Sequence, residues 1–246
     1  MRLGVYVINL DASVDRWAAL CNKAGEYGID LIRVAAIDGR KLSPADFRDV
    51  DWKGFIRHGG RAILPGEYGC YRSHVRCLSI FLQSDFEAAL VMEDDIDITA
   101  DLQERTTAIL EAAPSADVVK LFNHRNRGFL GVAISVFGDE IGRCLHGPQG
   151  SAACYVITRG GAAKALPFLH AMSFPFDVAL ERGWHHGLNV LSVRKNIVRL
   201  MGHSNNSQIG KQLDYRRVKF SGPRRVPTHL LRIAEYCRRI RYVLEI

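Results

Sequence analysis

The sequence lacks the features of a membrane-spanning or disulfide-stabilised protein. Its 246 residues contain no uninterrupted apolar run of the roughly 18–20 residues that a membrane-spanning helix needs. The opening "MRLGVYVINLD" has only a short apolar stretch, without the apolar core and small-residue cleavage site of a signal peptide. None of the six cysteines forms a C-x-x-C pair, so neither zinc binding nor dithiol chemistry is indicated. We therefore expect a cytoplasmic protein with reduced, mostly buried thiols.

The body of the chain also lacks an excess of charge of either sign. Residues 211–246 contain ten Lys or Arg and three Asp or Glu, which equals the whole net charge of +7. The whole chain has 33 Lys or Arg and 26 Asp or Glu, so residues 1–210 contain 23 basic and 23 acidic residues. A neutral body argues against a nucleic-acid-binding face. The pattern predicts a globular domain over residues 1–210 and a basic tail over residues 211–246 that has an anionic partner.

Short apolar runs alternate with helical patterns along most of the chain, without an internal repeat. Strands are predicted at 3–10, 29–37, 88–92, 116–122, 131–138, 151–158 and 188–193, and helices at 13–28, 64–83, 101–113 and 159–172. Residues 46–62 are predicted to be an irregular, flexible basic loop. This alternation predicts an α/β domain with a mostly parallel sheet, in which ligands bind beyond the carboxyl ends of the strands.

The segment "ALVMEDDIDI" (89–98) leads from a predicted strand into four carboxylates at that edge. In an extended backbone, Glu93, Asp95 and Asp97 would share one face and Asp94 would lie on the other. Oxygen ligands that converge in this way are typical of a Mg²⁺ or Mn²⁺ site. The alternative is a solvated acidic turn that caps the helix near Asp101. A metal site here would fit a sugar-nucleotide transferase and equally a two-metal phosphodiesterase.

Six segments in a fixed order resemble glycosyltransferase family 25, which includes lipopolysaccharide and collagen galactosyltransferases. They are "VYVINLDASVDRW", "RVAAIDGRKL", "LPGEYGCYRSH", "ALVMEDDIDI", "GSAACYVITRGGAAKAL" and "FPFDVAL", and the resemblance extends from residue 3 to about residue 210. It implies transfer of a hexose, most often galactose from UDP-galactose, to a lipooligosaccharide or related glycan acceptor. It also implies a GT-A-like fold, a divalent metal that is usually Mn²⁺, and inversion at the anomeric carbon.

An inverting transfer requires a carboxylate base that takes the proton of the acceptor hydroxyl. Asp177, in "FPFDVALERGW", is the candidate for this base, and Glu181 is held in reserve. The alternative for Asp177 is the N-cap of the following helix or a residue that orients the acceptor. Glu93, Asp95, Asp97 and His203 are the candidate metal ligands, with Asp97 in a supporting position.

Candidate contacts to the nucleotide-sugar donor lie in three segments. They are Asn9, Asp11 and Arg16 after the first strand, Glu67, Ser73 and His74 in the "GEYGCYRSH" block, and Glu93 and Asp94. Arg16 would bind phosphate oxygens, or would form a surface ion pair. For the 66–74 block the alternative is helix packing, with Gly66, Gly69 and Ser73 forming a stripe that allows close approach. Arg57, His58 and Arg61 would belong either to a lid over the donor or to a solvated loop.

The tail predicts an amphipathic helix over residues 228–246. Leu230, Ile233, Cys237, Ile240 and Leu244 fall on one stripe beside several arginines. Such a helix fits an anionic membrane surface, whereas the alternative is a helix docked on the domain.

Two other functions of the chain remain open besides glycosyl transfer: a metal-dependent phosphodiesterase, and a non-catalytic relative that binds carbohydrate or membrane.

Overall fold

The computed structural model describes residues 1–201 and 217–245. The strands are β1 (Leu3–Asn9), β2 (Leu31–Ala35), β3 (Ala88–Glu93), β4 (Ile96–Asp97), β5 (Val118–Lys120), β6 (Arg127–Ile134), β7 (Glu140–His146), β8 (Cys154–Thr158), β9 (Val190–Val193) and β10 (Arg199–Leu200). The α-helices are α1 (Val14–Tyr27), α2 (Trp52–Gly59), α3 (Pro65–Leu82), α4 (Leu102–Ala112), α5 (Arg159–Leu169), α6 (Phe176–Leu180), α7 (Gly183–His186) and α9 (Val226–Leu244). Short 3-10 helices span Gly39–Lys41, Pro44–Asp46 and Gly222–Arg225.

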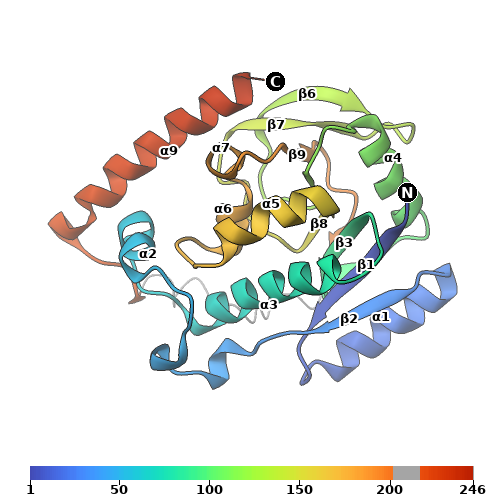
Figure 1. Ribbon diagram of the computed structural model, residues 1–246, viewed down its shortest axis with the longest axis horizontal. Helices are drawn as coiled ribbons and strands as arrows, with labels where there is room; N and C mark the ends of the chain where they lie inside the picture. The colour runs from blue at the N-terminus through green and yellow to red at the C-terminus, as the bar shows by residue number, and fades with distance from the viewer. Residues whose placement is uncertain (202–216, 246) are drawn as a thin grey trace.

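The central sheet has the strand order β2-β1-β3-β8-β5-β9-β7-β6 (Figure 1). β1 pairs in parallel with β2 and β3, and β5 pairs in parallel with β9. β8 runs antiparallel to β3 and β5, and β7 runs antiparallel to β9 and β6. Six of these eight strands therefore point the same way, which confirms the predicted α/β domain with a mostly parallel sheet.

The sheet is buried on both faces because its central strands are almost entirely apolar. In β1, Tyr6 and Ile8 pack into the core beneath α3, α5 and α6. The alternate residues Val5 and Val7 pack on the other face against α1 and α4. Successive strand side chains point to opposite faces, so an apolar run fills both cores at once. The molecule is therefore a helix–sheet–helix sandwich.

The polar segments identified from the sequence meet at one edge of the sheet. Parallel β1 and β3 both end there, at Asn9 and Glu93. Antiparallel β8 begins at the same edge, because Cys154 pairs with Met92. The loop that precedes β8 is therefore placed beside the ends of β1 and β3.

Two predicted elements are wrong. Residues 46–62 are not an irregular loop, because they contain α2, whose first turn is capped by the Asp51 carboxylate accepting from the Gly54 amide at 2.9 Å. The helix ends at Gly60, which has a φ of 64°. The strand predicted at 131–138 covers only the second half of β6 and the turn that leads to β7, and this turn includes Gly138 at a φ of 80°.

The small-residue stripe of α3 is explained by a close backbone crossing. A Cβ added to Gly69 would lie 2.4 Å from the Ile37 carbonyl oxygen, and one added to Gly39 would lie 1.7 Å from the Pro65 carbonyl oxygen. Both glycines are therefore required where the "AIDG" segment passes over the start of α3. The predicted close approach is confirmed, with the backbone of the chain itself as the neighbour.

Helix α9 lies along one flank of the molecule (Figure 1) and contacts α2, α7 and β7. Its buried residues are Thr228, Arg239 and Val243. Leu230 and Ile233 of the predicted apolar stripe are instead more than 60% exposed. The helix thus docks by a mixed polar face and leaves apolar side chains outside. No helix in the part of the chain that the structure describes is long and apolar enough to cross a membrane.

Candidate active site

Asp94 lies at the centre of a polar network that joins the ends of β1 and β3. Its carboxylate accepts from the Asn9 amide at 2.7 Å and pairs with Arg16 at 2.8 Å. Arg33 donates to Asn9 at 2.8 Å and pairs with Asp11 at 2.6 Å. Burial raises the pKa of Asp94, and the contacts with Asn9 and Arg16 oppose that rise. The structure thus brings together four residues predicted to contact the donor.

The acidic segment does not keep the predicted extended geometry. β3 ends at Glu93, and a turn at Asp94 and Asp95 separates it from β4. Because the turn breaks the alternation of side chains, Asp97 forms an ion pair with Lys23 of α1. The predicted common face of Glu93, Asp95 and Asp97 is therefore wrong. The fourth predicted ligand, His203, lies outside the described residues.

Glu93 and Asp95 retain the properties expected of ligands for a hard cation. The Oδ1 atom of Asp95 is buried and has no hydrogen-bond partner among the described residues. Burial, reinforced by the negative charges of Glu93 and Asp94, raises the pKa of Asp95 to about 7. A buried carboxylate oxygen without a partner is unfavourable unless a cation or proton compensates it. Asp95 therefore fits a cation ligand, and the charge of Glu93 acts on it from nearby.

His74 of α3 lies between β3 and α6. Its Nδ1 atom is 3.2 Å from the Tyr155 hydroxyl, and its Nε2 atom is 3.5 Å from Glu93 Oε1. Its ring stacks on Phe176 with centroids 4.2 Å apart. Since Asp177 follows Phe176 directly, His74 connects the acidic segment to the element that carries the candidate base. His74 is 1% exposed, so it is a packed residue of the site wall.

Asp177 lies in the first turn of α6, whose N-cap is Pro175. Asp177 is therefore not the N-cap, and that alternative is wrong. The Ser151 amide donates to its Oδ2 atom at 3.1 Å. Burial, together with the negative charge of Glu181, raises the pKa of Asp177, while Lys120 opposes the rise. A partly buried carboxylate with a raised pKa has the property required of a general base.

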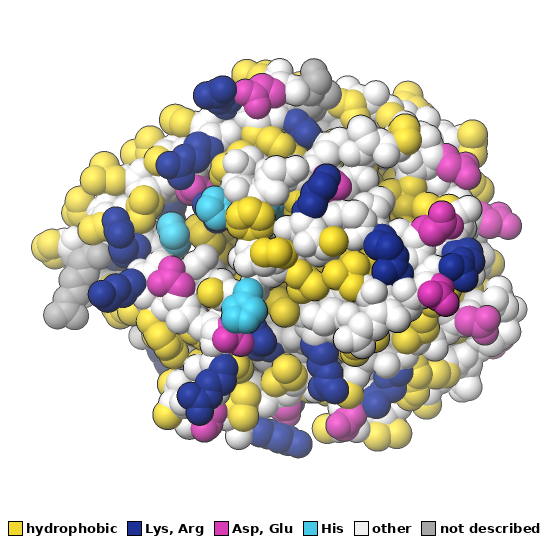
Figure 2. All heavy atoms as spheres, in the orientation of Figure 1, with side chains coloured by type: hydrophobic (Ala, Val, Ile, Leu, Met, Phe, Trp, Pro, Cys, Tyr) yellow, Lys and Arg dark blue, Asp and Glu magenta, His cyan; other side chains and the backbone are white. Residues whose placement is uncertain are grey.

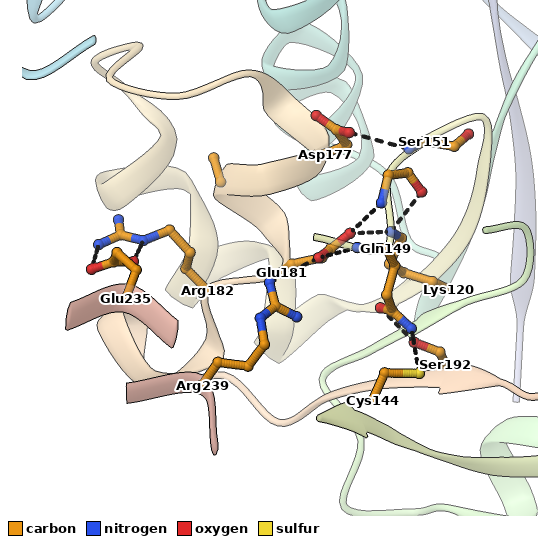
Figure 3. Close-up of polar contacts among 12 residues, drawn as sticks. Lys120, Cys144, Gln149, Ser151, Asp177, Glu181, Arg182, Ser192, Glu235 and Arg239 are labelled. Carbon is orange, nitrogen blue, oxygen red and sulfur yellow. Dashed lines mark hydrogen bonds and ion pairs between the residues drawn. The ribbon is translucent and has the colours of Figure 1, made fainter. Parts of the chain in front are cut away.

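Glu181 is the acceptor of a buried cluster beneath the same loop (Figure 3). It pairs with Lys120 at 2.6 Å and with Arg239 of α9 at 3.0 Å. The amides of Gln149 and Gly150 donate to its two oxygens at 3.0 and 3.1 Å. Burial alone would raise the pKa of Glu181, but the two cations and the hydrogen bonds lower it. These contacts favour a supporting role over a catalytic one.

Two further donor-binding candidates have their polar groups occupied within the fold. The Glu67 carboxylate accepts from Arg61 at 2.6 Å and from the Leu64 amide at 3.2 Å, which starts α3. The Ser73 hydroxyl donates to the Gly69 carbonyl at 2.6 Å and accepts from the Ile37 amide at 2.8 Å. These contacts favour the packing alternative for the block. Arg61 is buried by its pair with Glu67, which argues against both the lid and the solvated loop considered for this segment.

Several residues that shape this site were not identified from the sequence. Lys120 is 0% exposed at the end of β5, and Tyr155 is equally buried in β8. The 147–151 loop has positive φ values at Gly150 and Ser151, of 75° and 67°. A lysine inside an apolar run after "ADVV" was the one available signal, because an unpaired buried lysine is rare.

Known proteins share much of this sequence. A model of the family described as Glycosyltransferase family 25 (LPS biosynthesis protein) matches residues 3–180. A glycosyltransferase 25 family member of Aedes aegypti is 31% identical over 113 residues, or 44% of this chain and 19% of that protein. Procollagen galactosyltransferase 2 of Mus musculus is 24% identical over 118 residues, or 46% of this chain and 19% of that protein. The matched segments thus span about a fifth of the length of these relatives. Because the family match covers more than half of its residues, the chain belongs to glycosyltransferase family 25.

Proposed function

We propose that the chain is an inverting glycosyltransferase that moves a hexose, galactose from UDP-galactose, to a saccharide acceptor. The observation that carries this proposal is the placement of two carboxylate groups around one turn of α3. Burial raises the pKa of the Cys70 thiol on this turn, and the negative charges of Glu93 and Asp177 raise it further. Both carboxylates therefore lie near Cys70, and Glu93 Oε1 is 3.9 Å from its sulfur. One carboxylate group thus lies at the end of β3, where a diphosphate would bind, and the other lies at the start of α6.

Asp177 is the proposed base. Its raised pKa allows its carboxylate to take the proton of an acceptor hydroxyl as the glycosidic bond forms. The Ser151 amide holds the carboxylate in one orientation. The bond from the anomeric carbon to the diphosphate breaks on the opposite side of the sugar, so the configuration inverts.

Glu93 and Asp95 are the proposed ligands of a Mn²⁺ or Mg²⁺ ion. The orphaned Oδ1 atom of Asp95 supports this assignment. When bound, the cation would supply positive charge to the diphosphate leaving group. The proposed site uses neither Asp97, which pairs with Lys23, nor His203 as a ligand.

The network around Asp94 is the proposed wall of the nucleotide pocket. Asp11 is exposed and provides hydrogen-bonding groups for uracil or ribose at the carboxyl end of β1. Asn9 is buried, and its amide is occupied by Asp94 and Arg33, so it supports this wall from behind. Arg16 is engaged by Asp94 and keeps about a third of its side chain exposed, so it retains donors for a phosphate oxygen. The pair thus orients Arg16 without using all of its hydrogen-bonding capacity.

The acceptor is proposed to be a glycan carried on lipid, such as a lipooligosaccharide, presented at an anionic membrane. Support comes from α9, which exposes Leu230 and Ile233 and, farther along the same helix, Arg238. Figure 2 shows apolar and basic side chains together on the flank where α9 runs. An exposed apolar stripe next to cations fits a peripheral helix on the inner face of a cytoplasmic membrane.

The test is release of UDP from a panel of UDP-sugars, with and without Mn²⁺ and acceptor lipooligosaccharide. We expect UDP-galactose to be the best donor and release to require both Mn²⁺ and acceptor. Absence of turnover with every donor and glycan would overturn the proposal. Hydrolysis of a phosphodiester without UDP-sugar turnover would favour the phosphodiesterase alternative, and UDP binding without turnover would favour a non-catalytic relative.

A further inference from the structure

A second set of ligand atoms converges beside the acidic segment. Cys70 and His74 lie four residues apart on α3, so both point from the same face toward the end of β3. The ligand atoms of Cys70, His74 and Glu93 all lie within 4.8 Å of one another. None of the hard-cation contacts proposed above uses the thiol or the imidazole.

The separations suit a small tetrahedral cation. Zn²⁺ bonds of roughly 2.0–2.3 Å to N, O and S place neighbouring ligand atoms about 3.3–3.7 Å apart. The distance from His74 Nε2 to Glu93 Oε1 is 3.5 Å, and that from Cys70 Sγ to Glu93 Oε1 is 3.9 Å. The separation of His74 and Glu93 is therefore already that of a tetrahedral site, and the separation of Cys70 and Glu93 needs a contraction of a few tenths of an ångström.

The imidazole provides an independent sign that a ligand is expected. His74 is 1% exposed, yet its Nε2 atom has no hydrogen-bond partner among the described residues. Its other nitrogen is held by the Tyr155 hydroxyl at 3.2 Å, and Phe176 fixes the ring plane. Metal-binding histidines characteristically use the second nitrogen in this way. The unpartnered Nε2 atom is thus aimed at the thiol and carboxylate with its orientation already fixed.

We propose that Cys70, His74 and Glu93 form a binding site for a thiophilic divalent cation of the zinc class. Three protein ligands leave the fourth tetrahedral position open. Glu93 keeps 26% of its side chain exposed, which provides a route of entry. The Cys70 thiol loses its proton to solvent as the sulfur–metal bond forms. The site had no sequence signal because it combines a C-x-x-x-H pair with a distant glutamate rather than a C-x-x-C pair.

The site is tested by Zn²⁺ titration against a chromophoric chelator, without any sugar nucleotide. The parent is the Cys237→Ser chain, since Cys237 is an exposed thiol that would bind zinc nonspecifically. We expect one Zn²⁺ per chain, at least tenfold weaker binding in Cys70→Ser and in His74→Gln, and one sulfur ligand in the zinc K-edge absorption spectrum. Cys21→Ser, which changes a half-buried thiol on α1, is the matched control and should bind like the parent.

Parental affinity in both Cys70→Ser and His74→Gln, or a zinc shell without sulfur, would overturn the site. Thermal unfolding in metal-free buffer checks that each variant folds, and Cys70→Ser decides alone if His74→Gln does not. This assay stands even if the chain transfers no sugar. Under the proposed function, zinc would also withdraw Glu93 from the Mn²⁺ site, so Zn²⁺ should inhibit transfer by the parent. Equal inhibition of Cys70→Ser would contradict that shared use of Glu93.

Discussion

At the scale of single residues, two of the carboxyl groups with raised pKa values, Asp95 and Asp177, have different surroundings. Asp177 is oriented by the Ser151 amide, whereas one Asp95 oxygen has no partner among the described residues. A group with an oriented carboxylate is suited to proton transfer, and a group with an unsatisfied oxygen is suited to cation binding. The two assignments can therefore be tested separately.

Asp177→Asn should abolish proton abstraction while preserving the contact with Ser151, because the amide oxygen can accept the same hydrogen bond. We expect kcat to fall by about 10²–10⁴-fold with a much smaller change in the KM for the donor. In the parent chain, kcat/KM should begin to fall on the acid side at a higher pH than for an ordinary aspartate, because the pKa of Asp177 is raised. Steady-state kinetics measures both effects, and a parental kcat in the variant would exclude Asp177 as the base.

Asp95→Asn should stabilise the metal-free protein while removing Mn²⁺ binding. The pKa of Asp95 is raised to about 7, so stability falls as the pH rises from the ordinary aspartate pKa of about 4 up to that value. At about pH 8 we expect the variant to gain roughly 1–3 kcal/mol in free energy of unfolding, and at about pH 4 close to none. Urea unfolding in a chelator at the two pH values measures this. A less stable variant at the higher pH, or one with unchanged Mn²⁺ affinity, would contradict the assignment.

Residue types and their order predicted much of the site, but not the role of each member. Asn9, Asp11 and Asp94 were grouped correctly because the carboxyl ends of parallel strands meet at one edge of a sheet. Glu67 and Ser73 could not be distinguished from binding residues, since the same polar groups serve a helix start or a backbone crossing. Asp97 was misplaced because sequence does not reveal a turn inside an acidic run.

At the scale of elements, the prediction succeeded where apolar periodicity was strong. The helices α1, α3 and α4 and the buried strands β1, β3 and β8 lie within or close to the predicted ranges. β6 was misjudged because its residues are mostly exposed, so no alternation marks it. α2 was missed because three basic residues and two glycines obscure its short apolar face.

The link between α9 and the 147–151 loop predicts an effect of Arg239 on the site. Arg239 pairs with Glu181, which holds the backbone amides of Gln149 and Gly150 next to Ser151 (Figure 3). Arg239→Met should cost about 1.5–3 kcal/mol of stability, because it removes a charged hydrogen bond. We expect kcat to fall more than KM changes, because the loop that orients Asp177 loosens.

Arg239→Lys should restore part of both losses by retaining the charge. Arg238→Met is the matched control, because the neighbouring Arg238 is exposed and pairs with Glu235 on the same helix. Chemical unfolding and steady-state kinetics provide the two readouts. Loss of stability with an unchanged kcat in the folded fraction would limit Arg239 to a structural role.

At the scale of the whole molecule, the charge distribution and the packing of α9 act together. All of the net charge of +7 comes from residues 211–246, and the helix within them presents its polar side to the domain. The sequence could not predict this orientation, because an apolar stripe usually faces a protein core. Here Arg239 and Tyr242 occupy the inner side, through contacts with Glu181 and with the backbone of Leu188 and Val190.

The outward stripe predicts binding to anionic vesicles. We expect the chain to sediment with vesicles that contain phosphatidylglycerol and not with purely zwitterionic ones, and binding to weaken as salt is raised. Leu230→Ser combined with Ile233→Ser should lower the partition coefficient at least tenfold, because each buried Leu or Ile contributes about 1.5–3 kcal/mol. Val14→Ser, which changes an equally exposed apolar residue on α1, should bind like the parent chain. Because the substituted residues are exposed, the fold should persist, and equal sedimentation of all variants would show that α9 does not contact the membrane.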